Sequence, residues 1–133
     1  MLSCKFVVNK KTLTMRIEEI MITPVVITQK TVKVSYLKDT LTRKNISAVP
    51  VLEPDGTISG IVTTSDLTAT HNNDLLVKDI LTPKVHICLK NNRTKDVAKT
   101  MVKHNIHHMI VMEDGNIVGI VSAMDLIKVY AEE

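Results

Sequence analysis

The chain has 133 residues, 44% of them hydrophobic and 23% charged, which suits one compact domain or two small units that share a core. Its net charge of +3 is small and the sequence has no dense basic block, so we do not expect nucleic-acid binding. The apolar run Phe6–Val8 is too short for a signal peptide or a membrane span, and we expect a cytoplasmic protein without membrane contact.

Residues 1–15 precede the patterned part of the chain, and we expect them to form an edge strand or a dimer contact. Met15 stands directly before that part, so Met1 and Met15 are both candidate natural starts. From Arg16 the apolar spacing predicts a short helical turn over residues 16–22. Thr23-Pro24 ends this turn, because proline disfavours a helical conformation in the residue before it.

A strand, a helix and a hairpin are predicted next. Residues 25–28 indicate a short strand, and the spacing of Val34, Leu37 and Leu41 keeps one face of a following helix buried. The apolar residues 48–52 predict a buried strand. The turn signal "PDG" after them predicts a hairpin, because glycine adopts positive φ at little cost. The strand "TISGIV" returns, and a last helix begins at "TTSDL".

The second half of the chain repeats this pattern at an offset of 60 residues, which becomes 59 after Pro54. We therefore expect an α/β (α+β) fold of two β-α-β-β-α repeats, residues 16–72 and 73–133. The two repeats would cover one another's sheets with pseudo-twofold symmetry. The repeated elements are a helical turn over residues 74–81, a strand over 85–88, a helix with Val97, Met101 and Val102 buried, and a strand over 108–112.

One phrase occurs twice, as "GIVTTSDL" at residues 60–67 and "GIVSAMDL" at residues 119–126. Its Ser or Thr followed three residues later by Asp is a capping box, which requires no ligand. The same place also suits a nucleotide, because a helix N-terminus attracts phosphate and a carboxylate can accept two hydrogen bonds from a ribose. The residues alone leave both interpretations open. The side chains concerned are Thr63, Ser65, Asp66, Ser122 and Asp125.

The span from Arg16 to Tyr130 resembles a tandem pair of cystathionine β-synthase (CBS) domains, also called a Bateman module. The resemblance lies in "IMITP" and "ILTPKV", in "NISAVPVLEPDGTISGIVTTSDL" and in "NIHHMIVMEDGNIVGIVSAMDL". It implies a regulatory homodimer that is not an enzyme and signals metabolite state to another protein. Its ligand would be AMP, ADP or ATP, or else S-adenosylmethionine or NAD, without a further cofactor. The alternative is a structural dimerisation module with no physiological ligand.

The resemblance also implies two crossed binding sites. The neutral pair Ser47-Ala48 and the titratable pair His107-His108 occupy matching places, so we expect unequal affinity for phosphate. In one site Asp125 and Ser122 would hold ribose and phosphate, with adenine against Thr23, Val25, Ile46, Ser47 and Ala48. In the other, Asp66, Thr63 and Ser65 would act with Thr82, Val85, Ile106, His107 and His108.

Other chemistry has little support in the sequence. His104 and His107 have helix-like spacing for a metal, but no nearby Cys or carboxylate completes a zinc site, and we expect no metal. No GxSxG, HExxH or P-loop motif occurs, so we expect no catalysis. Cys88 reads as a core residue within a strand. A disulfide with Cys4 is an open alternative to the reduced thiols that we expect.

Overall fold

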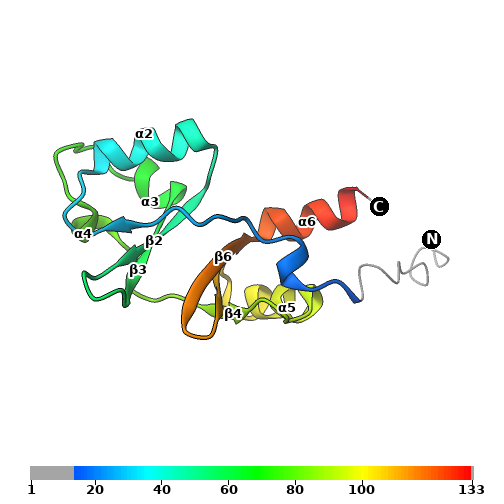
Figure 1. Ribbon diagram of the computed structural model, residues 1–133. Coiled ribbons are helices and arrows are strands. Elements are labelled where there is room, and N and C mark those ends of the chain that lie inside the picture. The colour runs from blue at the N-terminus through cyan, green and yellow to red at the C-terminus, as the bar shows by residue number, and fades with distance from the viewer. Residues whose placement is uncertain (1–13, 133) are drawn as a thin grey trace. The chain divides into compact units, whose positions relative to one another are not determined.

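The computed structural model describes residues 14–132, which fall into two compact units (Figure 1). Unit 1 contains the described residues up to Pro24 together with those from His86 onward. Unit 2 is the continuous segment Val25–Val85. Each unit has its own three-stranded sheet, and each is described here by itself.

In unit 2 the sheet has the strand order β1-β2-β3, in which β1 runs parallel and β3 antiparallel to β2. The register pairs Val49 of β2 with Val62 of β3. The elements of unit 2 are β1 (Thr28–Gln29), α2 (Val34–Lys44), β2 (Ala48–Leu52), β3 (Ile58–Thr63), α3 (Thr64–Thr68) and α4 (Val77–Ile80).

In unit 1 the same mixed sheet recurs with the order β4-β5-β6. The predicted fold class, two β-α-β-β-α repeats, is therefore confirmed. The elements of unit 1 are the 3₁₀ helix η2 (Ile17–Glu19), β4 (Ile87–Leu89), α5 (Thr94–His104), β5 (His108–Glu113), β6 (Asn116–Ser122) and α6 (Ala123–Ala131).

Two details differ from the sequence prediction. The first strand of each sheet is shorter and begins later, because only Thr28 and Gln29 pair with β2 and only Ile87–Leu89 pair with β5. Val102 is 82% exposed and not buried, because it lies about 100° around helix α5 from the buried Met101.

Matching residues end the helices and form the turns. Asn45 and Asn105 follow α2 and α5, and each has the left-handed φ of 52° that asparagine tolerates better than most residues. The β5–β6 hairpin turns on Asp114 and Gly115, both with positive φ, which is the two-residue turn that matches strand twist. The β2–β3 connection is longer and carries its positive φ at Gly56.

Each unit encloses one hydrophobic cluster built from equivalent positions. The cluster in unit 2 joins helices α2, α3 and α4 to one face of the sheet through Val34, Leu37, Leu41, Val49, Val51, Val62, Leu67 and Val77. The cluster in unit 1 contains Ile17, Cys88, Val97, Met101, Met109, Val111, Val121 and Leu126.

One further segment completes each unit: residues 74–82 in unit 2 and residues 14–22 in unit 1. We call it the leading segment because it comes before the first strand of a sequence repeat. In unit 2 the segment around α4 hydrogen-bonds to the loop before α2, where Val77 N donates to Val32 O at 2.8 Å, and Val77 is fully buried. In unit 1 Ile17 has the equivalent place and donates to Asn92 O at 2.9 Å. The compact units therefore combine chain ranges that differ from the sequence repeats, whose boundaries at residues 72 and 73 stay a prediction.

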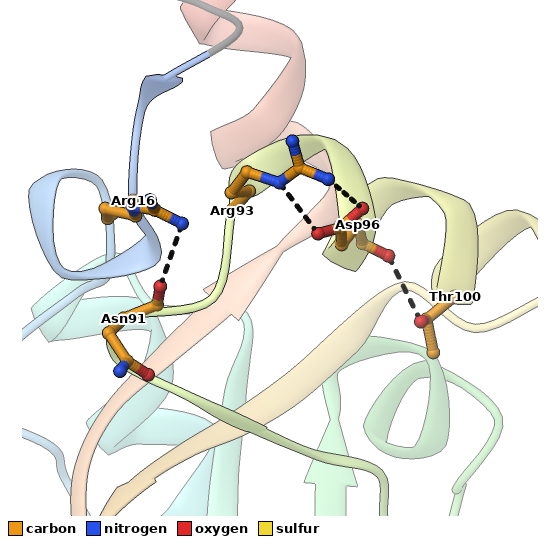
Figure 2. A network of polar contacts seen from close by, with 5 residues as sticks. All are labelled: Arg16, Asn91, Arg93, Asp96 and Thr100. Atoms are coloured by element: carbon orange, nitrogen blue, oxygen red, sulfur yellow. Dashed lines mark hydrogen bonds and ion pairs between the residues drawn. The ribbon is translucent and has the colours of Figure 1, made fainter.

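One polar contact joins the leading segment of unit 1 to the loop before α5, and two others lie at the start of that helix (Figure 2). Arg16 Nη1 donates to the carbonyl of Asn91 at 3.4 Å, and Arg93 forms an ion pair with Asp96 at 3.0 Å. Thr100 Oγ1 then donates to the Asp96 carbonyl at 3.2 Å. These groups are exposed to solvent, so each contact contributes little stability by itself.

No helix within residues 14–132 is long and apolar enough to cross a membrane.

The edge strand or dimer contact expected of the N-terminal extension falls mostly on residues 1–13, which lie outside the described part. Met15 belongs to unit 1, where its carbonyl accepts a hydrogen bond from Thr94 N at 3.0 Å.

Candidate ligand-binding site

The duplicated phrase forms the junction of a strand and a helix in both units. At the end of β3, Thr63 N donates to Asp66 Oδ2 at 2.9 Å, and Asp66 N donates back to Thr63 Oγ1 at 3.4 Å. At the end of β6, Ser122 N donates to Asp125 Oδ2 at 2.8 Å, and Asp125 N donates to Ser122 Oγ at 3.1 Å. Both copies are therefore capping boxes, which satisfy backbone groups that the helix leaves unpaired.

The neighbouring strand brings a second set of predicted residues to each cap. Ala48 is paired with Thr63, and Thr64 N donates to the carbonyl of Ser47 at 2.9 Å. In unit 1, His108 is paired with Ser122, and Ala123 N donates to the carbonyl of His107 at 2.8 Å. Each capping box therefore lies beside the start of the central strand of its own sheet.

The leading segment supplies a third part of the site in unit 2. Thr82 exchanges two backbone hydrogen bonds with Ile61, both 2.9 Å long, and so runs along the edge strand β3. Its hydroxyl reaches the carboxylate of Asp66, at 3.4 Å from Oδ1 and 3.5 Å from Oδ2. These distances are long for a hydrogen bond between oxygens, so a stronger donor could displace the threonine.

Glycine makes this close approach feasible in both units. A Cβ atom at Gly60 would overlap the carbonyl oxygen of Thr82 and lie 2.7 Å from Leu81 Cδ1. A Cβ atom at Gly119 would lie 2.6 Å from the sulfur of Met21. At Gly60 the backbone of the crossing segment therefore requires a residue without a side chain, whereas at Gly119 the atoms in the way belong to a side chain. This role of the two glycines was not predicted, although the repetition of "GIV" was the available signal.

The two carboxylates differ in their partners. Ile22 exchanges backbone hydrogen bonds with Ile120 of 2.8 and 3.2 Å, which brings the following Thr23 to the β6 edge of unit 1. Even so, Oδ1 of Asp125 accepts no hydrogen bond from any residue between 14 and 132. Asp125 thus keeps one oxygen available, while both oxygens of Asp66 face a hydroxyl.

Ion pairs recur at the other end of each central strand. Lys30 pairs with Glu53, and Lys90 pairs with Glu113, each at 2.5 Å. The hydrogen bonds from Lys30 and Ser59 lower the pKa of Glu53, and the hydrogen bond to Glu113 raises the pKa of Lys90. These charges lie at the strand end opposite the capping boxes and are not part of the candidate site.

The structure distributes the predicted site residues between the units. The crossed grouping, which combines each Asp with strand residues of the other repeat, joins residues of different units and stays a prediction. Unit 2 contains Val25, Ile46, Ser47, Ala48, Thr63, Ser65, Asp66, Thr82 and Val85, and unit 1 contains Thr23, Ile106, His107, His108, Ser122 and Asp125.

The histidines do not form a metal cluster in the described part of the chain. Within residues 14–132 no group of three or more His, Cys, Asp or Glu side chains is arranged to hold a metal ion. The helix ends at His104, and the strand begins at His108, where the sequence predicted its start. His104 lies against His86, with ring centroids 5.1 Å apart.

Comparison with known proteins agrees with this architecture. The model of the CBS domain matches residues 17–70 and again residues 77–132. The chain therefore belongs to the CBS domain family and carries a tandem pair of these domains.

Individual relatives extend this result. The chain is 32% identical to the uncharacterized protein MJ1426 of Methanocaldococcus jannaschii, over 86% of this chain and 90% of that protein. The CBS domain pair of protein MJ0100, solved with 5′-methylthioadenosine and S-adenosyl-L-methionine, has a TM-score of 0.81 and 24% identity, covering 90% of this chain and 98% of that one. The CBS domain of a bacterial CNNM/CorC family Mg²⁺ transporter, solved with ATP, has a TM-score of 0.77 and 24% identity over 92% of each chain.

Proposed function

We propose that this CBS pair is a regulatory module that binds an adenosine-containing ligand at the two capping boxes. The observation that carries the proposal is the duplicated junction itself. Each copy presents an Asp carboxylate and a cap hydroxyl at a helix start, beside the beginning of a buried strand. A carboxylate can accept both hydroxyls of a ribose, and a helix start favours phosphate.

Relatives support the choice of adenosine. Two similar folds were solved with adenosyl compounds or ATP, at identities that establish the fold alone. For this chain we infer AMP, ADP or ATP as the first candidates, with S-adenosylmethionine and NAD as others. The capping role does not compete with ribose binding, because the cap uses Oδ2 of Asp125 and leaves Oδ1 available.

Isothermal titration calorimetry with AMP, ADP, ATP, NAD and S-adenosylmethionine tests the proposal. We expect at least one of them to bind, while the matching guanosine nucleotide binds more weakly because the pocket for the base is expected to be specific for adenine. If none of the five binds to the wild-type chain at millimolar concentration, the sensor proposal is wrong.

A second candidate function is a structural interaction module, and one observation favours it. Helix α6 exposes a stripe of apolar side chains at a spacing of three residues, where Met124 is 58%, Ile127 is 55% and Tyr130 is 66% exposed. We propose that this stripe contributes to a homodimer. Analytical ultracentrifugation would reveal the dimer by its mass.

CBS domains also occur within enzymes, and here we propose regulation without catalysis.

A further inference from the structure

Unit 2 contains a solvent-open cavity between helices α2 and α3 that the proposed adenosine sites do not use. Its volume is about 640 Å³, within the range of small-molecule sites. Leu41, Ile46 and Leu67 line it with apolar surface, and Lys38 and His71 line its polar part.

The cavity exists because the last helix of the first repeat is short. Helix α3 ends at Thr68 after five residues, whereas its counterpart α6 continues for nine residues to Ala131. Between α5 and α6 lies a small space of about 20 Å³, bordered among others by Val129 and Tyr130. The extra helical turn of α6 places Val129 and Tyr130 in unit 1, whereas the equivalent residues of unit 2 follow the end of α3.

In unit 2, basic and polar side chains occupy the positions where unit 1 has apolar or aromatic residues. At the repeat offset of 59, Thr70 and His71 stand where Val129 and Tyr130 stand in unit 1. At the offset of 60, Lys38 stands where Ala98 borders the small space. The change in the first repeat therefore adds two groups that can carry positive charge.

Hydrogen bonds fix the cationic group of the cavity. Lys38 Nζ donates to the carbonyl of Thr70 at 3.1 Å and to Asn73 Oδ1 at 2.9 Å, which leaves one of its three N–H groups for a ligand. The side chains of Asn45 and His71, which also line the cavity, have no hydrogen-bond partner among residues 14–132. None of the lining residues in the described chain is Asp or Glu.

We propose that this cavity binds a small amphipathic anion, a carboxylate attached to an apolar ring or chain. The apolar part would lie on Leu41, Ile46 and Leu67, and the carboxylate would accept the free N–H of Lys38. The side chain of Asp66 points instead to Thr63 and Thr82. Ile46 is the one residue that the cavity shares with the predicted adenosine sites, and the proposal does not rest on those sites.

Calorimetric titration with 1-naphthaleneacetate and its neutral analogue 1-naphthaleneacetamide tests the charge requirement. We expect the acetate to bind about tenfold or more tightly than the amide, as a hydrogen bond to a charged group is worth. Lys38→Met should weaken the acetate to the level of the amide. Lys44→Met, which removes the same charge from the same helix outside the cavity, should leave the acetate affinity unchanged.

A matched pair of tryptophan variants tests the location. Thr42 lines the cavity, and the equivalent residue at the offset of 60 is the exposed Val102. We expect Thr42→Trp to abolish binding of the acetate and Val102→Trp to preserve it. Far-ultraviolet circular dichroism shows whether each variant is folded.

Several results would overturn the proposal. The first is that the acetate does not bind to the wild type at millimolar concentration, and the second is that the amide binds with equal affinity. The third is that Lys38→Met and Lys44→Met lower the affinity for the acetate equally. The fourth is that a folded Thr42→Trp chain binds the acetate normally. If that variant does not fold, the Lys38 and Lys44 comparison decides. Displacement of the acetate by saturating AMP would place the probe in an adenosine site and would also overturn it.

Discussion

Replacing Gly60 with alanine tests whether the segment around Thr82, which crosses β3, requires glycine at the start of "GIVTTSDL". The added methyl group would overlap the carbonyl oxygen of Thr82, which is backbone and cannot rotate away. Relief requires the segment to move and so weakens its two hydrogen bonds with Ile61, at about 0.5–1.5 kcal/mol each. Overpacking adds about 1–3 kcal/mol, and the lower entropy of the unfolded alanine chain returns about 0.4–1 kcal/mol.

We therefore expect Gly60→Ala to lower the free energy of unfolding by about 1–5 kcal/mol. Gly119→Ala is the matched control, because the nearest atom there is the sulfur of the flexible Met21 side chain. A change of rotamer, at about 0.5–1.5 kcal/mol, moves Sδ and Cγ of Met21 away, and only Cβ at 3.1 Å requires a small backbone shift. We therefore expect the control to lose less stability than Gly60→Ala.

Urea denaturation followed by far-ultraviolet circular dichroism measures both variants, and the midpoints are comparable when the slopes agree. Equal losses in the two variants, or a larger loss for Gly119→Ala, would refute the reasoning. Such a result would mean that the leading segment of unit 2 does not approach β3 as closely as the structure has it.

Two further predictions concern titratable side chains. Burial raises the pKa of the Cys88 thiol from its ordinary 9.0 to about 11. In a Cys4→Ser chain at pH 8, thiol reagents should therefore label Cys88 about a hundredfold more slowly than an ordinary cysteine, and urea should restore the rate. Rapid labelling of the native chain would contradict the buried position. The pKa of Glu53 is lowered below its ordinary 4.5, so its carboxylate stabilises the fold above that pH and the contribution disappears as the pH falls through the folded pKa. The loss of stability in Glu53→Gln, measured in urea, should be present at pH 7 and should shrink as the pH falls below 4.5. A loss that does not change with pH would argue against the ion pair with Lys30.

Much of the fold could be predicted because the sequence contains the same pattern of elements twice. A strand such as residues 48–52 and a turn such as "EDG" are ambiguous alone, but their recurrence at a fixed offset fixes the element order. The capping boxes were also predictable, since Thr63 and Asp66 act within one turn of helix. Local chemistry of this kind is encoded in neighbouring residues.

The pairing of distant segments was harder to predict. Residues 16–22 look like the start of the first repeat, yet Ile17 is buried in the cluster of unit 1 with Val97 and Leu126. Hydrophobic spacing tells which face is buried but not which sheet buries it. The cavity beside Lys38 could not be predicted either, because it depends on where α3 ends. In a polar stretch of sequence, the residue at which a helix ends is difficult to predict.

The central claim is that Asp66 and Asp125 bind the ribose of an adenosine ligand. Its most direct test is calorimetric titration of ATP and 2′-deoxyATP into the wild type and into an Asp66→Asn, Asp125→Asn chain. Asparagine keeps one oxygen for the cap but loses the charge and the second acceptor. We predict that the wild type binds ATP about tenfold or more tightly than the deoxy compound, and that the variant stays folded but loses both affinity and preference. Undiminished ATP binding by the folded variant, with the same preference, would contradict the claim.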